Sequence, residues 1–227
     1  MRKIGLIGGT SWHSTIVYYR LINELVGEKI GTQANPELIL YSLNIELMRE
    51  QNKEKINNKY LEVSRTLQEA GAEAIVICAN TPHMAFPFVQ PEIDIPILHI
   101  ADAIGKEASK KELKTLGLLG NRPTMQGDFI SSHLSEKYDI DTLIPDDEYI
   151  DNCHHFVSNE LTQGIFSTEA KIFFQEQMQK LREKGAEGII LGCTELPMLL
   201  SEHDFDLPMI ATTTLHAQMA ADFILGN

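Results

Sequence analysis

The chain has 227 residues, 43% of them hydrophobic and 22% charged, which is typical of a globular protein and excludes the disordered and fibrous classes. Its 19 Lys and Arg residues face 32 Asp and Glu residues, and the resulting net charge of −13 argues against nucleic acid and anionic membranes as partners. The length allows one large domain or two domains of about 100 residues each.

Residues 1–100 alternate short apolar runs with stretches of helical period. Strands are predicted at residues 4–7, 38–43, 74–78 and 95–98, and helices at residues 15–25 and 55–70. Ser11 and Ser14 both suit the N-cap of the first helix. Alternation of apolar strands with helices predicts a parallel sheet that is covered on both faces.

The second half of the chain shows the same alternation. Strands are predicted at residues 116–119, 141–144 and 188–191, and helices after Thr124 and at residues 169–184. The polar run at residues 106–111 is the expected linker between the halves. Residues 214–225 predict a final helix that returns to the first half.

The two halves also resemble each other in sequence. Residues 4–8 align with 116–120 and residues 94–98 with 206–210, both at an offset of 112, and residues 69–77 align with 183–191 at an offset of 114. Matches in one order at nearly one offset indicate a duplicated unit. We therefore expect an α/β fold of two pseudo-symmetric domains, residues 1–102 with 212–227 and residues 103–211. Each should hold a parallel four-stranded sheet flanked by helices, with the active site in the cleft between the domains.

Ligands of such sheets gather at the carboxyl ends of the strands. There the first half presents Gly8-Gly9-Thr10-Ser11 and Ala79-Asn80-Thr81-Pro82-His83. Glycines before a helix suit a bound anion such as a carboxylate, whereas the lysine of a P-loop and the third glycine of a dinucleotide site are missing. A tight turn that binds nothing explains the glycines equally well.

Cys193 follows the predicted strand at residues 188–191 and precedes a short helix. A thiol at a helix N-terminus has a lowered pKa and forms a thiolate near neutrality, although packing as a small hydrophobe is the commoner role of a lone cysteine. The repeat offset of 114 pairs Cys193 with position 79. Two such positions suit the two faces of one substrate carbon.

Three stretches together identify a family. Ile-Gly-Leu-Ile-Gly-Gly-Thr-Ser-Trp at residues 4–12, the segment at residues 79–83, and Leu-Gly-Cys-Thr-Glu at residues 191–195 resemble the aspartate/glutamate racemase family. The resemblance implies an amino-acid racemase without a cofactor, two α/β domains and a homodimer. It also implies that one cysteine thiolate removes the α-proton while a thiol on the opposite face returns a proton.

One position departs from the family pattern. The usual Cys-Asn-Thr is Ala79-Asn80-Thr81 in this chain, and Cys78 lies one residue too early, on the opposite face of its strand. Cys193 and Thr81 are the expected catalytic residues, and water, Thr81 or His83 would serve the face that lacks a thiol at Ala79. We expect a slow racemase for aspartate, glutamate or a related small amino acid.

The binding residues follow from their loops and from the same resemblance. The expected substrate-binding residues are Gly9, Thr10, Arg49, Asn80, Thr81, Thr124, Thr194 and Glu195. Glu195 would orient the amino group or cap the following helix. A guanidinium suits a carboxylate, but a solvated helix-face arginine is nearly as good an interpretation of Arg49, and the same caution applies to Arg122. Residues 163–167 resemble another substrate-facing loop, which holds no lysine in this chain.

Other sites and functions are weighed against this prediction. Cys153-His154-His155 suggests a metal site, but adjacent side chains on a helix point about 100° apart, so a polar helix segment is preferred and neither metal nor cofactor is expected. A Cys-His hydrolase would use His83 or His216, without a local signature. The alternative functions are a silent binder of amino acids or diacids and a one-thiol relative of the decarboxylases.

The expected compartment follows from cysteine usage and from the lack of targeting signals. Three cysteines cannot form a disulfide framework, and they suit a reducing environment. The first residues lack a signal-peptide pattern, and no apolar run reaches the length of a membrane span. We expect a soluble cytoplasmic protein with a small-molecule partner.

Overall fold

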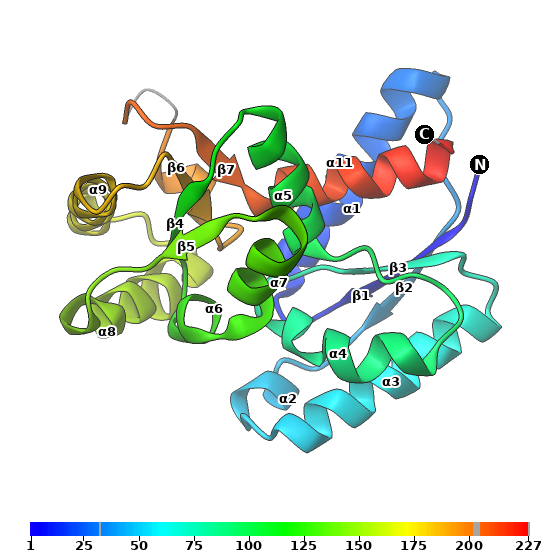
Figure 1. Ribbon diagram of the computed structural model, residues 1–227. Helices are drawn as coiled ribbons and strands as arrows, with labels where there is room; N and C mark the ends of the chain where they lie inside the picture. The colour runs from blue at the N-terminus through cyan, green and yellow to red at the C-terminus, as the bar shows by residue number, and fades with distance from the viewer. Residues whose placement is uncertain (32, 202–204, 227) are drawn as a thin grey trace. The chain divides into compact units, whose positions relative to one another are not determined.

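The computed structural model describes residues 1–31, 33–201 and 205–226. These divide into two compact units, Met1–Ile100 with His216–Asn227 (the first unit) and Ala101–Leu215 (the second unit). Each unit holds one parallel sheet with helices packed against it (Figure 1). The predicted α/β class with two parallel sheets is therefore confirmed.

The first unit is built on a three-stranded sheet in the order β2-β1-β3. Its strands are β1 (Ile4–Gly8), β2 (Leu38–Ser42) and β3 (Ala74–Ile77). Its helices are α1 (Trp12–Ile30), α2 (Glu46–Arg49), α3 (Lys53–Glu69) and α4 (Phe86–Val89), with 3-10 turns at Thr81–Ala85 and Gln90–Glu92. Of the two predicted N-caps of α1, Ser11 is the one observed, and its side chain accepts a hydrogen bond from the Ser14 amide.

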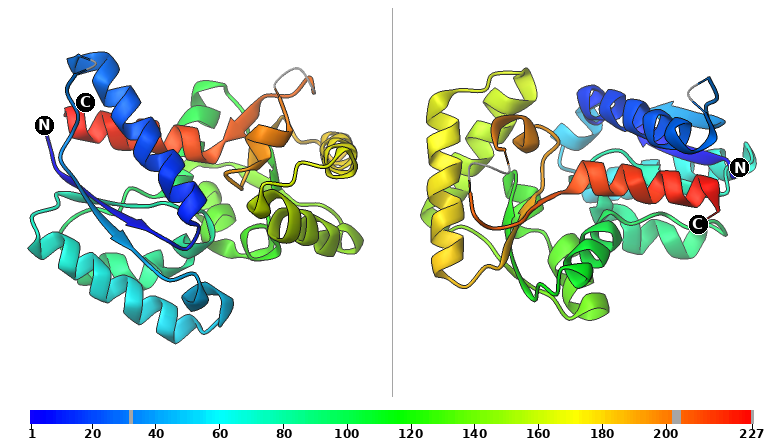
Figure 2. Two further views of the ribbon diagram at one scale, coloured as in Figure 1. Left: turned by 180° about the vertical axis from the view of Figure 1, so that it is seen from behind. Right: turned by 90° about the horizontal axis from the view of Figure 1, so that it is seen from above.

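Side chains alternate between the two faces of this sheet, as strand geometry requires. Ile7 and Ile75 pack on the side of α3, with Tyr60 and Leu67. On the other side, the core is formed with α1 and with the last helix, α11 (Thr212–Leu225), through residues such as Ala217. Figure 2 shows α1 and α11 on this face. The predicted return of the final helix to the first half is confirmed.

The predicted fourth strand of the first unit is reduced to a single bridge. Only Ile97 pairs with β3, opposite Ile75. Pro96 has no N–H to donate, although its carbonyl accepts from the Ile75 amide at 2.9 Å. Helix α5 begins at Ile100, so the chain leaves the sheet before further residues can pair.

The second unit has a complete four-stranded sheet in the order β5-β4-β6-β7. The strands are β4 (Thr115–Leu119), β5 (Asp141–Leu143), β6 (Gly188–Leu191) and β7 (Met209–Ala211). The helices are α5 (Ile100–Lys110), α6 (Arg122–Gln126), α7 (Asp128–Tyr138), α8 (Asp147–His155), α9 (Thr168–Glu183) and α10 (Leu196–Leu199), with a short π-helix at Phe156–Glu160 and a 3-10 helix at Leu161–Gln163.

The polar run at residues 106–111 is not a linker, because most of it lies in α5. Ala101, Ile104 and Ala108 are buried along one side of this helix, so the charged residues occupy its outer face. The polar run belongs to an amphipathic helix, and the apolar residues of that helix begin before residue 106. None of the helices in the described part of the chain combines the length and the apolar character needed to span a bilayer.

Candidate active site

The turn between β1 and α1 is held by its own side chains. The Gly9 amide donates to Thr15 Oγ1 at 2.9 Å, and Thr15 Oγ1 donates to the Ser11 carbonyl at 2.9 Å. Gly9 is buried and Thr10 is half-buried. The Gly9 amide therefore already has an acceptor within the protein, and its role at a substrate carboxylate stays a prediction. The role of Thr10 in substrate binding stays a prediction.

Cys78, at the end of β3, belongs to the core. Its side chain lies in the cluster formed with α1 and α11, and burial raises the pKa of its thiol. The Cys78 carbonyl accepts a hydrogen bond from Ser14 Oγ at 2.8 Å. The prediction that Cys78 faces the packing and does not replace the missing thiol at half-buried Ala79 agrees with this position.

His83 binds the two peptide carbonyls that follow Cys78. Its Nδ1 lies 2.9 Å from the Ala79 oxygen and 3.1 Å from the Asn80 oxygen, and its Nε2 lies 3.2 Å from the Ile100 nitrogen. Carbonyls only accept and the Ile100 amide only donates, so Nδ1 carries the proton and the ring is neutral. Burial is the main cause that lowers the pKa of His83, and the nearby His99 and His216 lower it further.

The bonding of His83 decides its role. Both ring nitrogens are engaged and the ring is fully buried, so His83 is not the proton donor for the second substrate face. It fixes the loop that carries Asn80 and Thr81. Both ring nitrogens of His216 are hydrogen-bonded as well. Its Nε2 donates to the Leu98 carbonyl at 2.7 Å, and its Nδ1 accepts from the Tyr18 hydroxyl at 2.9 Å. The two histidines named for a hydrolase are thus structural.

Cys193 follows β6 and is paired with a carboxylate. Its Sγ lies 2.7 Å from Glu195 Oε2, and the two residues are 9% and 8% exposed. Burial raises the pKa of the Cys193 thiol, and the charge and hydrogen bond of Glu195 raise it further. The backbone amides of Glu195 and Leu196, at the start of α10, act in the opposite direction without outweighing these effects. The lowered pKa expected from the helix N-terminus is therefore wrong.

The proton between Cys193 and Glu195 can be assigned to one of the two side chains. At neutral pH the Cys193 thiol donates to the Glu195 carboxylate. A neutral thiol can deliver a proton to a carbanion, and the carboxylate can take the thiol proton when a base is required. Glu195 makes no side-chain capping bond to α10. Sequence reasoning named Glu195 but missed this partner, because a spacing of two residues does not reveal that two side chains turn toward each other.

Replacement of Glu195 tests the electrostatic part of this account. Glu195→Gln removes a negative charge but keeps an acceptor, so the pKa of Cys193 should fall while burial keeps it above that of a free thiol. Thiolate absorbance followed from pH 6 to pH 11 measures the change. Cys153→Ala in the same background removes the signal of a second buried thiol, whose pKa is raised by burial to about 12. An unchanged Cys193 titration would contradict the pairing.

Thr124 and Arg49 are also predicted to bind the substrate, and the first is buried while the second is exposed. Thr124 is fully buried, and its methyl packs beside Gly120 and Gly192 at the ends of β4 and β6. Arg49 lies on exposed α2 and pairs with Glu46 at 2.9 Å. The role of Thr124 at the substrate stays a prediction, and Arg49 must leave its present partner to bind a substrate carboxylate.

Arg122 is also occupied, and the sequence had left its role open. Its guanidinium pairs with Asp151, and its amide lies 3.4 Å from His154 Nδ1. Asn80 is buried, and Thr81 and Thr194 are half-buried. These three residues lie in the loops that follow β3 and β6, and their roles at the substrate stay predictions.

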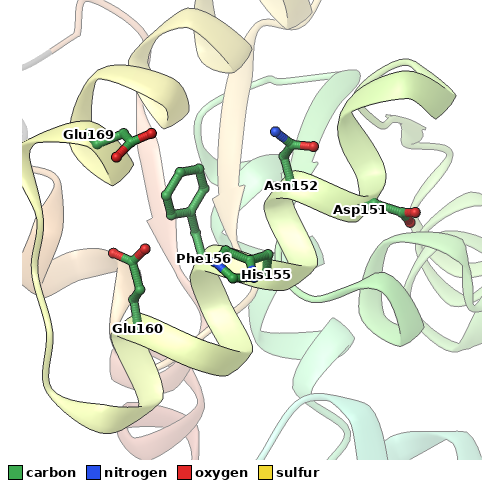
Figure 3. Close-up of a pocket in the computed structure, with 6 residues that line it drawn as sticks. All are labelled: Asp151, Asn152, His155, Phe156, Glu160 and Glu169. Carbon is green, nitrogen blue, oxygen red and sulfur yellow. The ribbon is translucent and has the colours of Figure 1, made fainter.

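A pocket elsewhere in the second unit has the wrong charge for an amino-acid carboxylate. It has a volume of about 310 Å³ and is lined by Asp151, Asn152, His155, Phe156, Glu160 and Glu169 (Figure 3). Three of these side chains are carboxylic acids. No group of three or more His, Cys, Asp or Glu residues in the ranges 1–31, 33–201 and 205–226 is arranged to hold a metal ion. Cys153 is buried, and His155 lies 3.0 Å from the Asn159 amide nitrogen.

Solved structures resemble this chain along its whole length. A candidate Asp/Glu racemase from Yersinia pestis is 36% identical, with a TM-score of 0.93, 99% of this chain covered and 100% of that chain. An aspartate racemase homologue from Pyrococcus horikoshii is 34% identical, with a TM-score of 0.87 and coverage of 99% and 100%. An aspartate racemase from Picrophilus torridus, at 21% identity and a TM-score of 0.75, shares the fold.

Curated relatives are more distant in sequence. The broad specificity amino-acid racemase RacX of Bacillus subtilis is 20% identical over 228 residues, which cover 98% of each chain. A glutamate racemase of Listeria monocytogenes is 26% identical over 153 residues, which cover 65% of this chain and 54% of that protein. The match therefore spans about half the length of the curated glutamate racemases. The family model for Asp/Glu/Hydantoin racemases matches residues 7–220, and the chain belongs to this family.

Proposed function

We propose that the chain is an amino-acid racemase that works without a cofactor on aspartate, glutamate or a related small amino acid. The observation that carries the proposal is the buried pair of Cys193 Sγ and Glu195 Oε2, 2.7 Å apart at the carboxyl end of β6. Family membership and the similarity to a broad specificity amino-acid racemase support the substrate class. Asn80, Thr81 and Thr194 would hold the α-carboxylate and the amino group.

Each proton moved in the proposed reaction has a donor and an acceptor. Glu195 accepts the thiol proton, and the Cys193 thiolate removes the α-proton of one enantiomer, so the electron pair stays on the α-carbon. Water or the Thr81 hydroxyl on the opposite face, beside Ala79, then gives a proton to that carbon. The proton held by Glu195 neutralises the hydroxide or alkoxide that remains. Because alanine cannot transfer a proton, the second face lacks a dedicated acid or base, which costs a factor of about 10² to 10⁴.

One observation favours a second function. With its raised pKa, the Cys193 thiol is protonated at neutral pH and is a proton donor without prior activation. A one-thiol enzyme that protonates the carbanion left by decarboxylation of a malonate-type diacid needs only this group. Such an enzyme makes no demand on position 79.

Exchange of the α-proton with D₂O tests the proposal. Each enantiomer of aspartate, glutamate and other small amino acids is incubated with the protein, and loss of the α-proton signal is followed by NMR. We expect exchange that accelerates as the pH rises, because the thiolate fraction increases, and a loss of about 10²- to 10⁴-fold in Cys193→Ala.

The matched control is Cys153→Ala, which removes a buried thiol that the proposed mechanism does not use and should leave exchange unchanged. If no amino acid exchanges its α-proton, and the wild type and Cys193→Ala give the same result, the proposal of a racemase would be wrong. Cys193-dependent release of CO₂ from a substituted malonate would then support the second function. Thermal stabilisation by amino acids that persists in Cys193→Ala without turnover would indicate a silent binder.

A further inference from the structure

Tyr60 carries a buried hydroxyl that makes no hydrogen bond. This side chain lies on α3, is 0% exposed and belongs to the core cluster that includes Ile7 and Leu43. Within the part of the chain that the structure describes, its Oη atom has no hydrogen-bond partner. A buried hydroxyl without a partner loses the hydrogen bonds that water gives it in the unfolded chain, and this loss destabilises the fold. Stability therefore does not explain the hydroxyl of Tyr60.

Tyr60 lies toward the carboxyl ends of the strands, where ligands of such sheets gather. Helix α3 packs along the sheet and runs opposite to its parallel strands (Figure 1). Leu67 of this helix packs against Gly5 of β1, where an added Cβ would lie 2.9 Å from Leu67 Cδ1. Tyr60 precedes Leu67 by about 10 Å along the helix. That length corresponds to about three strand residues, so Tyr60 is level with Gly8, the last residue of β1.

The Thr10 side chain, in the turn after β1, is a polar neighbour of this hydroxyl. Burial raises the pKa of Tyr60, and the nearby Thr10 hydroxyl acts in the opposite direction. No hydrogen bond joins the two side chains in the structure, because Tyr60 Oη has no partner among the described residues. Thr10 is half-buried, and a threonine hydroxyl can accept one hydrogen bond while it donates another. Thr10 can therefore accept from Tyr60 while it donates to a ligand.

The second half of the chain shows that packing at this position needs only the aromatic ring. The repeat offset of 114 pairs Tyr60 of α3 with Phe174 of α9. The structure agrees with this pairing, because Leu67 and Leu181, which the same offset pairs, each pack against a glycine of an inner strand. Phe174 and Tyr60 are both fully buried. The hydroxyl is therefore the chemical group by which the first unit departs from its duplicate at this position.

We propose that Tyr60 is a positioning residue of the amino-acid site, an inference that rests on the proposed function. When an amino acid binds, the Tyr60 hydroxyl donates to Thr10 Oγ1, and the Thr10 hydroxyl donates to a substrate carboxylate. Tyr60 acts through Thr10 and does not touch the substrate. The hydrogen bond that the free protein lacks forms only in the bound state, so it favours that state and increases the affinity for the ligand.

Two tyrosine variants of the full chain separate positioning from packing. Tyr60→Phe removes the unpaired hydroxyl, so it should leave the melting temperature of the ligand-free protein unchanged or raise it by up to about 4 °C. The matched control is Tyr18→Phe, because Tyr18 is equally buried but donates to His216 Nδ1 at 2.9 Å. This control removes the partner of a buried imidazole nitrogen, and its melting temperature should fall by about 4 °C or more. Circular dichroism measures both changes.

Titration calorimetry measures the binding step without any need for turnover. The probes are both enantiomers of aspartate, glutamate and other small amino acids. For each amino acid that binds the wild type, Tyr60→Phe should raise the dissociation constant by about 3- to 10-fold, whereas Tyr18→Phe should bind like the wild type at a temperature where it is folded. Thr10→Val keeps the shape of the side chain and removes its hydroxyl. Adding Tyr60→Phe to Thr10→Val should cause no further loss, because one hydrogen bond can be removed only once.

Each contrary result overturns a different part of this account. Equal affinity in Tyr60→Phe and the wild type would exclude the positioning role and leave the proposed function intact. A melting temperature of Tyr60→Phe that falls as far as that of Tyr18→Phe would exclude it too, because the hydroxyl would then be bonded in the free protein. A further loss of affinity in the Thr10→Val background would show that Tyr60 does not act through Thr10. If no amino acid binds the wild type, the proposed function is wrong, and this inference with it.

Discussion

Ala79→Cys should increase amino-acid racemisation by about 10²- to 10⁴-fold, the range that one positioned acid or base contributes. The substitution adds one sulfur atom at a half-buried position in a loop that is already fixed. His83 and Ser14 bind the carbonyls of three consecutive residues, 78–80, so the new side chain enters a defined backbone. Polarimetry or coupled detection of the product enantiomer measures the gain.

The control for this experiment is Ala79→Ser. Serine has nearly the size of cysteine, but its hydroxyl is a far weaker acid, so it should not reproduce the gain. Equal rates in wild type, Ala79→Ser and Ala79→Cys, with the variants folded, would show that position 79 does not face the substrate. A gain in Ala79→Ser alone would indicate that polarity or water binding, and not thiol chemistry, limits the reaction.

Gly9→Ala should destabilise the protein by about 4 kcal/mol or more. Gly9 has a φ of +89°, and a Cβ there would overlap the backbone oxygen and nitrogen of Leu43. The positive φ alone costs about 1–3 kcal/mol, and the overlap cannot be relieved by a side-chain rotation because both Leu43 atoms belong to the main chain. Urea unfolding gives the free energy.

Gly71→Ala separates the two causes. Gly71 has almost the same φ, +88°, and an added Cβ would meet nothing within 4 Å. Its alanine variant should therefore lose only about 1–3 kcal/mol, the cost of the dihedral angle. Equal losses at the two glycines would show that the approach of the first turn to Leu43 does not constrain the chain.

The central strands could be predicted from the sequence because they are buried on both faces. Continuous apolar runs such as residues 4–7 and 188–191 mark such strands, and β1 and β6 occupy them. The prediction failed where a tertiary effect overrode the pattern. Pro96 and the early start of α5 reduced one apolar run to a bridge, and the polar run at residues 106–111 was the outer face of α5.

The candidate site was predictable in its location but not in its chemistry. Cys193 and Glu195 could be named because they follow a buried strand. The pKa of Cys193 could not be derived, because it depends on burial and on the direction in which the Glu195 side chain turns. The bond from the Gly9 amide to Thr15, which gives this amide an acceptor within the protein, likewise needs coordinates.

We propose that Cys193 and position 79 serve opposite faces of one substrate carbon. The direct test compares two proteins that each carry one thiol at the proposed site, the wild type and the double variant Ala79→Cys with Cys193→Ala, in D₂O on each enantiomer of the best substrate. We expect opposite preferences, with each protein exchanging the α-proton of a different enantiomer faster. The same preferred enantiomer in both proteins would contradict it.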